Sequence, residues 1–263
     1  MALLTSDEND GSTRVSGDPH AYEVFGRPKA GDPFILLCEH ATRLAPDWDV
    51  SEVDEKILQT HWGYDLGADD LTRLVASQTE CPAVLSRFSR LVCDPNRDPE
   101  EPSFILDSIE GQPLSFNQDL SEQERRRRRE RYFDAYHDAV DCTVSDRAAL
   151  DRLFCILSIH SFTPVYQGER RSVEVGVLFD RDEGQAIALA ERIEGEGFRT
   201  ALNAPYSGYD GLIYSARRHG RAHRVSYFEL EVRQDLLEEA SGREALAGAI
   251  CRALGSWSEF RQG

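Results

Sequence analysis

The sequence predicts an α/β fold in which helices flank both faces of a mostly parallel, mixed sheet. Short apolar runs, typical of buried strands, alternate along the chain with longer stretches of helical periodicity. Such alternation is typical of a parallel sheet covered by helices. The chain has 263 residues and shows no second composition regime, so we expect a single domain over 21–263. The polar, Gly/Ser/Asp-rich segment at 1–20 is expected to be mobile.

The expected elements follow from these patterns in chain order. Strands are expected at 33–39, 82–86, 90–93, 153–160, 173–179, 198–202 and 224–231. Helices are expected at 51–60, 62–78, 121–148, 183–196, 212–219 and 239–257. Ser121 and Glu124 form a capping-box pattern at the start of the third helix. The Pro/Gly/Asp/Ser-rich stretch at 98–119 is long for a plain connection, and such loops often form lids or bind ligands.

Composition excludes several classes of function. A formal net charge of -17 argues against nucleic-acid binding, because neutralising phosphates requires a basic face. The arginine run at 125–129 is interleaved with glutamates, as on a solvated helix face. No basic, apolar leader and no apolar run of about 18 residues is present, so we expect a cytoplasmic protein without membrane contact. The six cysteines lack CxxC spacing and are expected to be reduced there.

Acidic and basic side chains follow three of the apolar runs. His40 ends the first run, His160 ends another, and Glu231 lies at the end of a third. The carboxyl ends of strands form the edge at which α/β folds place their active sites. A single histidine there is more often structural, but two at two strand ends favour a shared metal. Neutral imidazole suits Zn²⁺, and a catalytic zinc site has three protein ligands and an open water position.

The third ligand is expected to be a carboxylate. Asp65, in the helix opening that starts at His61, is the favoured candidate, and Glu39 beside His40 is the alternative. Adjacent residues of a strand point to opposite faces, so Glu39 and His40 could share one ion only after the strand has ended. For His61, a place at the helix start or behind a ligand is as probable as metal binding.

Two further stretches carry candidate site residues. Asp94-Pro95-Asn96-Arg97 has turn-forming composition, and its Asn-Arg pair also suits a clamp for a carboxylate. Glu231 beside a metal could take a proton from bound water. The alternative for Glu231 is a simple ion pair with an arginine. Glu229 shares its face by the two-residue period of a strand.

Six ordered motifs, which cover roughly residues 30 to 240, resemble the N-formylglutamate amidohydrolase family. They are Cys38-Glu-His-Ala41, His61-Trp-Gly-Tyr-Asp-Leu-Gly-Ala68, Ser89-Arg-Leu-Val-Cys-Asp-Pro-Asn-Arg97, His160-Ser-Phe-Thr-Pro164, Asn203-Ala-Pro-Tyr206 and Glu231-Val-Arg-Gln-Asp-Leu236. That family is distantly similar to the zinc carboxypeptidases, and the resemblance implies their α/β fold and one zinc ion. It implies three zinc ligands: His40, Asp65 and His160.

The resemblance also implies the other roles at the site. Glu231, rather than Glu229, matches the general base, while Asn96 and Arg97 match the clamp for the substrate's carboxylate. Tyr206 corresponds, more loosely, to a mobile substrate-contacting tyrosine. A glutamate side chain would need a second cation, for which the candidates are Arg171 and Arg90. Arg233, in the last motif, is grouped with the substrate-binding residues.

The expected activity is therefore zinc-dependent hydrolysis of the amide of N-formyl-L-glutamate, a small anionic substrate. One alternative is a metallohydrolase of other acyl-amino acids or short peptides. Another is a non-enzymatic binding protein that retains the fold. A serine hydrolase is disfavoured, because the sequence contains no Gly-x-Ser-x-Gly motif. A homo-oligomer is compatible with the sequence.

Overall fold

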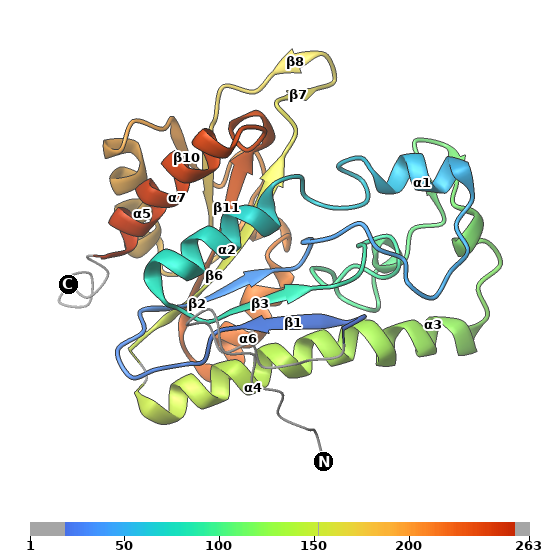
Figure 1. The fold of residues 1–263 in the computed structure, drawn as a ribbon, viewed down its shortest axis with the longest axis horizontal. Helices are drawn as coiled ribbons and strands as arrows, with labels where there is room; N and C mark the ends of the chain where they lie inside the picture. The colour runs from blue at the N-terminus through green and yellow to red at the C-terminus, as the bar shows by residue number, and fades with distance from the viewer. Residues whose placement is uncertain (1–18, 152, 256–263) are drawn as a thin grey trace.

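A seven-stranded mixed sheet lies at the centre of the protein, in the order β1-β3-β2-β6-β11-β9-β10 (Figure 1). The computed structural model describes residues 19–151 and 153–255, so nearly all of the segment expected to be mobile lies outside the described residues. Strands β3, β2, β6 and β11 run parallel, whereas β1 and the β9–β10 pair run antiparallel to their neighbours β3 and β11. The strands are β1 Tyr22–Phe25, β2 Phe34–Cys38, β3 Ala83–Ser86, β6 Cys155–Phe162, β9 Val175–Leu178, β10 Thr200–Leu202 and β11 Ser226–Arg233.

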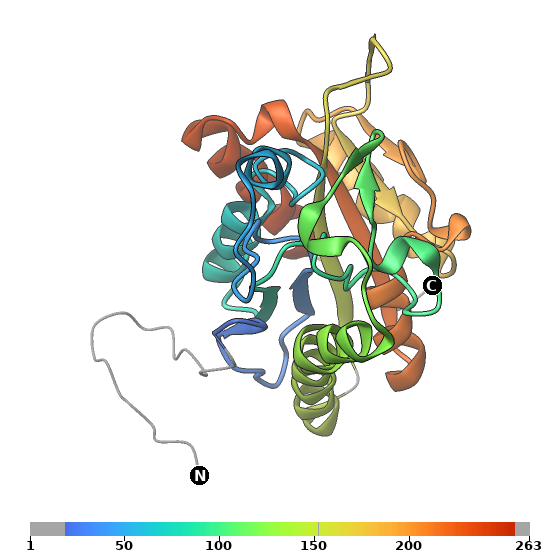
Figure 2. The same ribbon diagram turned by 90° about the vertical axis from the view of Figure 1, so that its right-hand side faces the viewer.

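Helices cover both faces of this sheet, which confirms the expected fold class (Figures 1 and 2). Helices α2, α5 and α7 supply one apolar core, and α4 and α6 supply the other. The helices are α1 Glu52–Leu58, α2 Ala68–Thr79, α3 Glu122–Arg128, α4 Ala135–Leu150, α5 Glu183–Gly195, α6 Tyr214–His223 and α7 Ala240–Gly255. A π-helical turn at Arg129–Asp134 joins α3 to α4, so the expected helix at 121–148 is one rod with a local irregularity.

The alternation of side chains sorts the central strands between the two cores. In β11, Phe228, Leu230 and Val232 lie in the core under α2, α5 and α7, and Tyr227 lies in the core under α4 and α6. Glu229 and Glu231 share the face of Tyr227 because side chains alternate along a strand. The sheet therefore delivers its polar residues to the α4–α6 face.

Several expected boundaries are wrong. Residues 90–93 form turns rather than a strand, since the Val92 amide bonds the Ser89 carbonyl and the Ser89 hydroxyl accepts from the Leu91 amide. The side chains of this apolar run are buried all the same, so its hydrophobicity reflects burial and not extended backbone. The second helix begins at Ala68 and not at residue 62. The half-exposed edge strand β1 was not expected from the sequence.

The 98–119 stretch is an ordered connection. It contains the 3₁₀ turns Pro102–Phe104 and Ser115–Asn117 and the small hairpin of β4 (Ser108–Ile109) and β5 (Gln112–Pro113). A second hairpin, of β7 (Val165–Tyr166) and β8 (Glu169–Arg170), projects beyond the carboxyl end of β6 (Figure 1). Across residues 19–151 and 153–255, no helix combines the length and the apolarity that a membrane crossing requires.

Candidate metal centre

The carboxyl ends of the parallel strands bring the two candidate histidines into contact. His160 lies in β6 directly opposite Glu231 of β11, and His40 follows the end of the neighbouring strand β2. The two imidazole rings meet edge to face, with centroids 4.7 Å apart and an interplanar angle of 78°. Residues separated by 120 positions in the chain thus share one site because their strands are adjacent and parallel.

Asp65 completes a three-residue cluster with these rings. Its Oδ2 lies 2.8 Å from Nδ1 of His160 and 3.4 Å from Nδ1 of His40. The backbone fixes Asp65 there, since its amide donates to the His40 carbonyl at 3.0 Å and the Ser161 amide donates to its carboxylate at 3.2 Å. All three side chains are buried, and their ligand atoms lie within 4.8 Å of one another.

The donor set of this cluster fits a divalent metal ion. Nδ1 of His40 is buried and has no hydrogen-bond partner among the residues that the structure describes. Nδ1 of His160 faces only the Asp65 carboxylate. Two imidazole nitrogens and one carboxylate oxygen match the ligands of a catalytic zinc site.

The opposite nitrogens of both rings face carboxylates. Nε2 of His40 donates to Asp94 at 2.7 Å, and Asp94 is in turn bound by Arg90 at 2.8 Å and by the Asn96 amide at 2.8 Å. Nε2 of His160 lies 3.0 Å from Oε2 of Glu39. Partners of this kind orient metal-binding imidazoles and fix which ring nitrogen carries the proton.

Glu231 has a free carboxylate oxygen beside the cluster. Its Oε2 is buried without a hydrogen-bond partner in residues 19–151 and 153–255, and its carboxylate lies within 4.8 Å of ligand atoms of His160 and Glu229. Glu229, on the same face, accepts a hydrogen bond from Asn96 at 3.1 Å and lies 3.5 Å from Nε2 of His160. Glu231 therefore offers a carboxylate oxygen that no described residue occupies, whereas one oxygen of Glu229 already accepts from Asn96.

The charges of the site perturb one another strongly. Burial raises the pKa of Glu231 well above its ordinary value, and the negative charges of Glu229 and Asp65 add to this effect. Burial lowers the pKa of His160, but Glu229, Asp65 and Glu39 outweigh it, so the pKa of that ring is raised well above the usual range. Burial raises the pKa of Asp65, but the two histidines outweigh it and hold that pKa far below normal. Such opposed shifts in one cluster are typical of functional sites.

Comparison with known proteins places this site in a family. The family model of N-formylglutamate amidohydrolases matches residues 32–238. The chain belongs to the N-formylglutamate amidohydrolase family. It is therefore an amide hydrolase, and both the resemblance seen in the motifs and the expected enzyme class are confirmed.

Solved structures support the same assignment of fold. A gene product of Agrobacterium tumefaciens is 32% identical, with a TM-score of 0.82 over 91% of this chain and 95% of that chain. An N-formylglutamate amidohydrolase from Ralstonia eutropha is 17% identical, with a TM-score of 0.71 over 91% of this chain and 99% of that chain, and shares the fold. A metallo-carboxypeptidase from Burkholderia cenocepacia is 11% identical, with a TM-score of 0.46 over 96% of this chain and 66% of that chain, which is too low to bear on the fold. No curated protein matches the sequence.

Two of the arginines predicted to bind substrate in this amidohydrolase are free of carboxylate partners. Arg97 donates to the Asn96 carbonyl at 3.0 Å, and Arg171 reaches the Tyr206 hydroxyl at 3.3 Å and the Thr163 carbonyl at 3.4 Å. Within the described part of the chain, neither Arg97 nor Arg171 forms an ion pair. The Arg171 guanidinium also lies 5.3 Å from the centre of the Tyr206 ring. Arg97 and Arg171 are therefore the cations available to an anionic substrate.

Three of the other residues predicted to contact substrate are held by protein groups. Arg90 pairs with Asp94 and lies 3.7 Å from Asp65. The Asn96 side chain donates to the Leu212 carbonyl and to Glu229 and accepts from the Ser215 amide. Arg233 is buried and binds Asp235, Glu174 and two carbonyls. This geometry favours positioning roles for Arg90, Asn96 and Arg233 over direct contact with substrate.

Sequence reasoning missed two residues that support the histidines. Asp94 was interpreted only as part of a turn and an anion clamp, although it bonds His40. Ser158 donates to Glu39 and lies two residues before His160 on the same strand face. The two-residue period of the strand was the signal that could have identified Ser158.

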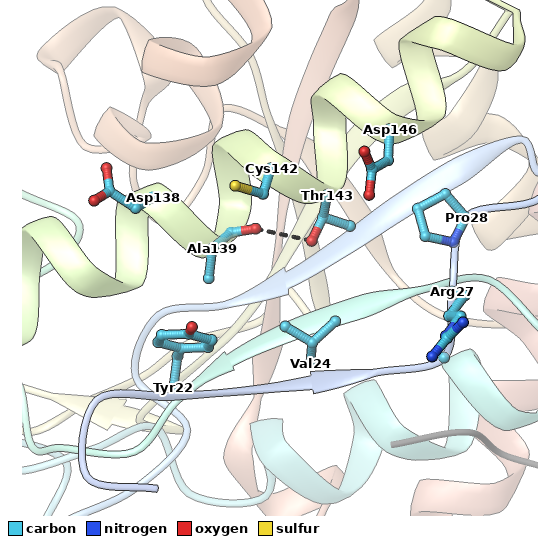
Figure 3. Close-up of a pocket in the computed structure, with 10 residues that line it drawn as sticks. Tyr22, Val24, Arg27, Pro28, Asp138, Ala139, Cys142, Thr143 and Asp146 are labelled. Carbon is cyan, nitrogen blue, oxygen red and sulfur yellow. Dashed lines mark hydrogen bonds between the residues drawn. The ribbon is translucent and has the colours of Figure 1, made fainter. Parts of the chain in front are cut away.

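A surface cavity of about 450 Å³ lies apart from the metal centre, between β1 and α4 (Figure 3). Tyr22 and Val24 line one side and Ala139, Cys142 and Thr143 line the other. The Thr143 hydroxyl donates to the Ala139 carbonyl inside its own helix. The cavity shares no residue with the His40–Asp65–His160 cluster, so it is not part of the candidate active site.

Proposed function

We propose that the protein is a zinc-dependent amidohydrolase that converts N-formyl-L-glutamate to formate and glutamate. The observation that carries this proposal is the convergence of Nδ1 of His40, Nδ1 of His160 and the Asp65 carboxylate beside the free oxygen of Glu231. Membership of the N-formylglutamate amidohydrolase family supports the choice of substrate. The ligands proposed for zinc are His40, Asp65 and His160.

The chemistry is divided between the ion and the protein. A bound zinc ion would lower the pKa of its water to ~7, far below that of bulk water, and polarise the scissile carbonyl. Glu231 accepts the proton of the attacking water and delivers it to the nitrogen of the leaving amine. Acid–base assistance of this kind contributes about 10²–10⁴-fold to the rate. Glu229, two residues earlier on the same face of β11, already accepts a hydrogen bond from Asn96 and is therefore the less suitable base.

Substrate binding in this proposal depends on the free cations. Arg97 holds the α-carboxylate, and Arg171, steadied by Tyr206, holds the side-chain carboxylate. Guanidinium groups grip carboxylates in a bidentate fork. The net charge of -17 repels an anionic substrate at long range, so these arginines and the metal must supply a local positive potential. The proposed partner is thus a small anion and not a nucleic acid.

Glu231→Gln tests the proposed base. We expect the variant to bind one zinc ion per chain and to lose about 10²–10⁴-fold in kcat, because its amide cannot accept the water proton. Metal content by elemental analysis and turnover of N-formylglutamate are the two measurements. Glu229→Gln is the matched control and should lose less, since Asn96 already occupies its carboxylate. A zinc-loaded Glu231→Gln enzyme with near wild-type kcat would refute the assignment.

A substrate panel tests the specificity separately. Formyl, acetyl and dipeptide derivatives of glutamate and of a neutral amino acid are compared by kcat/KM. The proposal requires the formyl and glutamate groups to be preferred. Equal rates with dipeptides would instead favour a metallohydrolase of acyl-amino acids or short peptides.

A further inference from the structure

We propose that Glu39 is a positioning residue that orients the His160 imidazole for metal binding, and is not itself a ligand. The inference concerns the metal site of the proposed function and rests on it. It assigns the residue that the sequence left as an alternative third ligand.

The geometry at His160 separates Glu39 from the metal cluster. Oε2 of Glu39 lies 3.0 Å from Nε2, whereas the Asp65 carboxylate lies 2.8 Å from Nδ1. The two nitrogens point away from each other across the imidazole ring. An ion held by Nδ1 together with Asp65 is therefore on the side of His160 opposite to Glu39.

Glu39 is itself held in place on the α4–α6 face. Its side chain is fully buried, and its Oε2 accepts a second hydrogen bond, from the Ser158 hydroxyl. Both contacts of this carboxylate, with Nε2 of His160 and with the Ser158 hydroxyl, are made by the same oxygen. Turning this carboxylate toward the ion would take its Oε2 away from the buried Ser158 hydroxyl and from Nε2 of His160, and leaving buried donors unpaired is unfavourable.

The arrangement repeats at the other histidine. Asp94 faces Nε2 of His40 as Glu39 faces Nε2 of His160, so each ring presents Nδ1 to the cluster. A hydrogen bond from Nε2–H to a carboxylate fixes the tautomer in which Nδ1 carries the free lone pair. Adjacent residues of the chain therefore have different roles: His40 is a proposed ligand, and Glu39 orients His160 of the neighbouring strand.

Metal affinity tests this role without turnover. Zinc affinity is measured by competition with a chromophoric chelator, and the coordination is compared through the absorption spectrum of the cobalt(II)-loaded protein. We expect Glu39→Gln to bind one ion with affinity reduced about 10–100-fold, the usual effect of removing such a partner, and with a cobalt spectrum like that of the wild type. Asp65→Asn, which changes a proposed ligand, should lose more affinity and alter the spectrum.

Ser158→Ala provides a milder second variant. It removes the hydroxyl that donates to Glu39 and should weaken zinc binding in the same direction but by less. Wild-type zinc affinity in a folded Glu39→Gln protein would overturn the proposal. So would a cobalt spectrum altered by Glu39→Gln and left unchanged by Asp65→Asn, because Glu39 would then be the ligand.

Two further results would each test one of the two proposals separately. Were Glu39→Gln unable to fold, undiminished zinc affinity in Ser158→Ala would overturn the proposal, and reduced affinity would support it. A wild-type protein that binds zinc but does not hydrolyse N-formylglutamate would contradict the proposed substrate alone, since the affinities are measured without it.

Discussion

The two faces of the central sheet differ sharply at the carboxyl end of the strands. On the face under α2, α5 and α7, β11 places Phe228, Leu230 and Val232 in an apolar core. On the other face the same strand begins with Tyr227 in the core and continues with Glu229 and Glu231. Alternate side chains of one strand thus pack in an apolar core or point into the candidate site.

The neighbouring strands repeat this division. In β6, Leu157 and Ile159 face the apolar core, while Ile156 is followed on the opposite face by Ser158 and His160. Burying a charged or polar group is unfavourable unless a partner compensates it. The polar face holds buried atoms without a partner, including Nδ1 of His40 and Oε2 of Glu231, as expected where a ligand rather than the fold completes the interactions. The unpaired atoms of the candidate site thus lie on the face under α4 and α6, as expected if that face binds a further group.

Leu230→Ala tests the apolar face and is expected to have the largest effect on stability. Leu230 is fully buried, so its truncation should lower the free energy of unfolding by about 2–5 kcal/mol, measured by urea denaturation. Zinc affinity of the folded variant should match the wild type, because the side chain points away from the cluster. Leu230→Met conserves volume and should cost less than about 1.5 kcal/mol. A large loss of zinc affinity in folded Leu230→Ala would contradict the separation of the faces.

Asn96→Ala tests a residue of the polar face that sequence reasoning placed in the substrate clamp. Its removal takes a hydrogen-bond partner from the Leu212 carbonyl, the Ser215 amide and Glu229, so we expect a loss of about 1–3 kcal/mol in the free energy of unfolding. Arg97→Ala is the matched comparison. It should raise KM with little effect on stability, because Arg97 forms no ion pair within the described residues. An Asn96→Ala protein of wild-type stability whose KM rises as in Arg97→Ala would restore Asn96 to the clamp.

The sequence predicted the architecture well because strands and helices alternate with clear periods. It also predicted that His40 and His160 lie at strand ends. That these ends are adjacent follows from the strand order β2-β6-β11, which local patterns do not encode. Local patterns failed where burial occurs without regular structure, as at 90–93, whose apolar side chains line a buried turn.

The same limit applies to the individual roles at the site. Whether Glu39 or Asp65 faces the shared side of the rings depends on which imidazole nitrogen each approaches. Whether Asn96 can contact substrate depends on its hydrogen bond with Glu229, which is distant in the chain. Whether Arg90 can do so depends on its ion pair with Asp94, which forms within a turn. Motifs identify the residue types of a site, whereas tertiary contacts decide which of those residues remain available.

The smallest expected effect is a pH dependence of stability that comes from titrating groups on the face under α4 and α6. In the metal-free protein the pKa of His160 is raised above its unfolded value, so its contribution is complete below about pH 6.5 and is lost as the pH rises toward the folded value. The raised pKa of Glu231 acts in the same direction, because the native state retains a proton that the unfolded chain releases. We expect the free energy of unfolding, measured with a chelator present, to fall between pH 6.5 and 8 by up to ~1.4 kcal/mol per pH unit for each proton retained.

Zinc-loaded protein and the Leu230→Ala variant are the controls for this dependence of the free energy of unfolding on pH. Ligands must lose their protons to bind a metal, so zinc affinity should rise over the same pH range. The free energy of unfolding of zinc-loaded protein should therefore not fall between pH 6.5 and 8. Leu230→Ala should lower the whole curve without changing its slope, since it alters no titrating group. His160→Gln should flatten the slope of the metal-free protein. An identical slope in metal-free wild-type and His160→Gln protein would show that the charge of His160 is not coupled to folding as its contacts require.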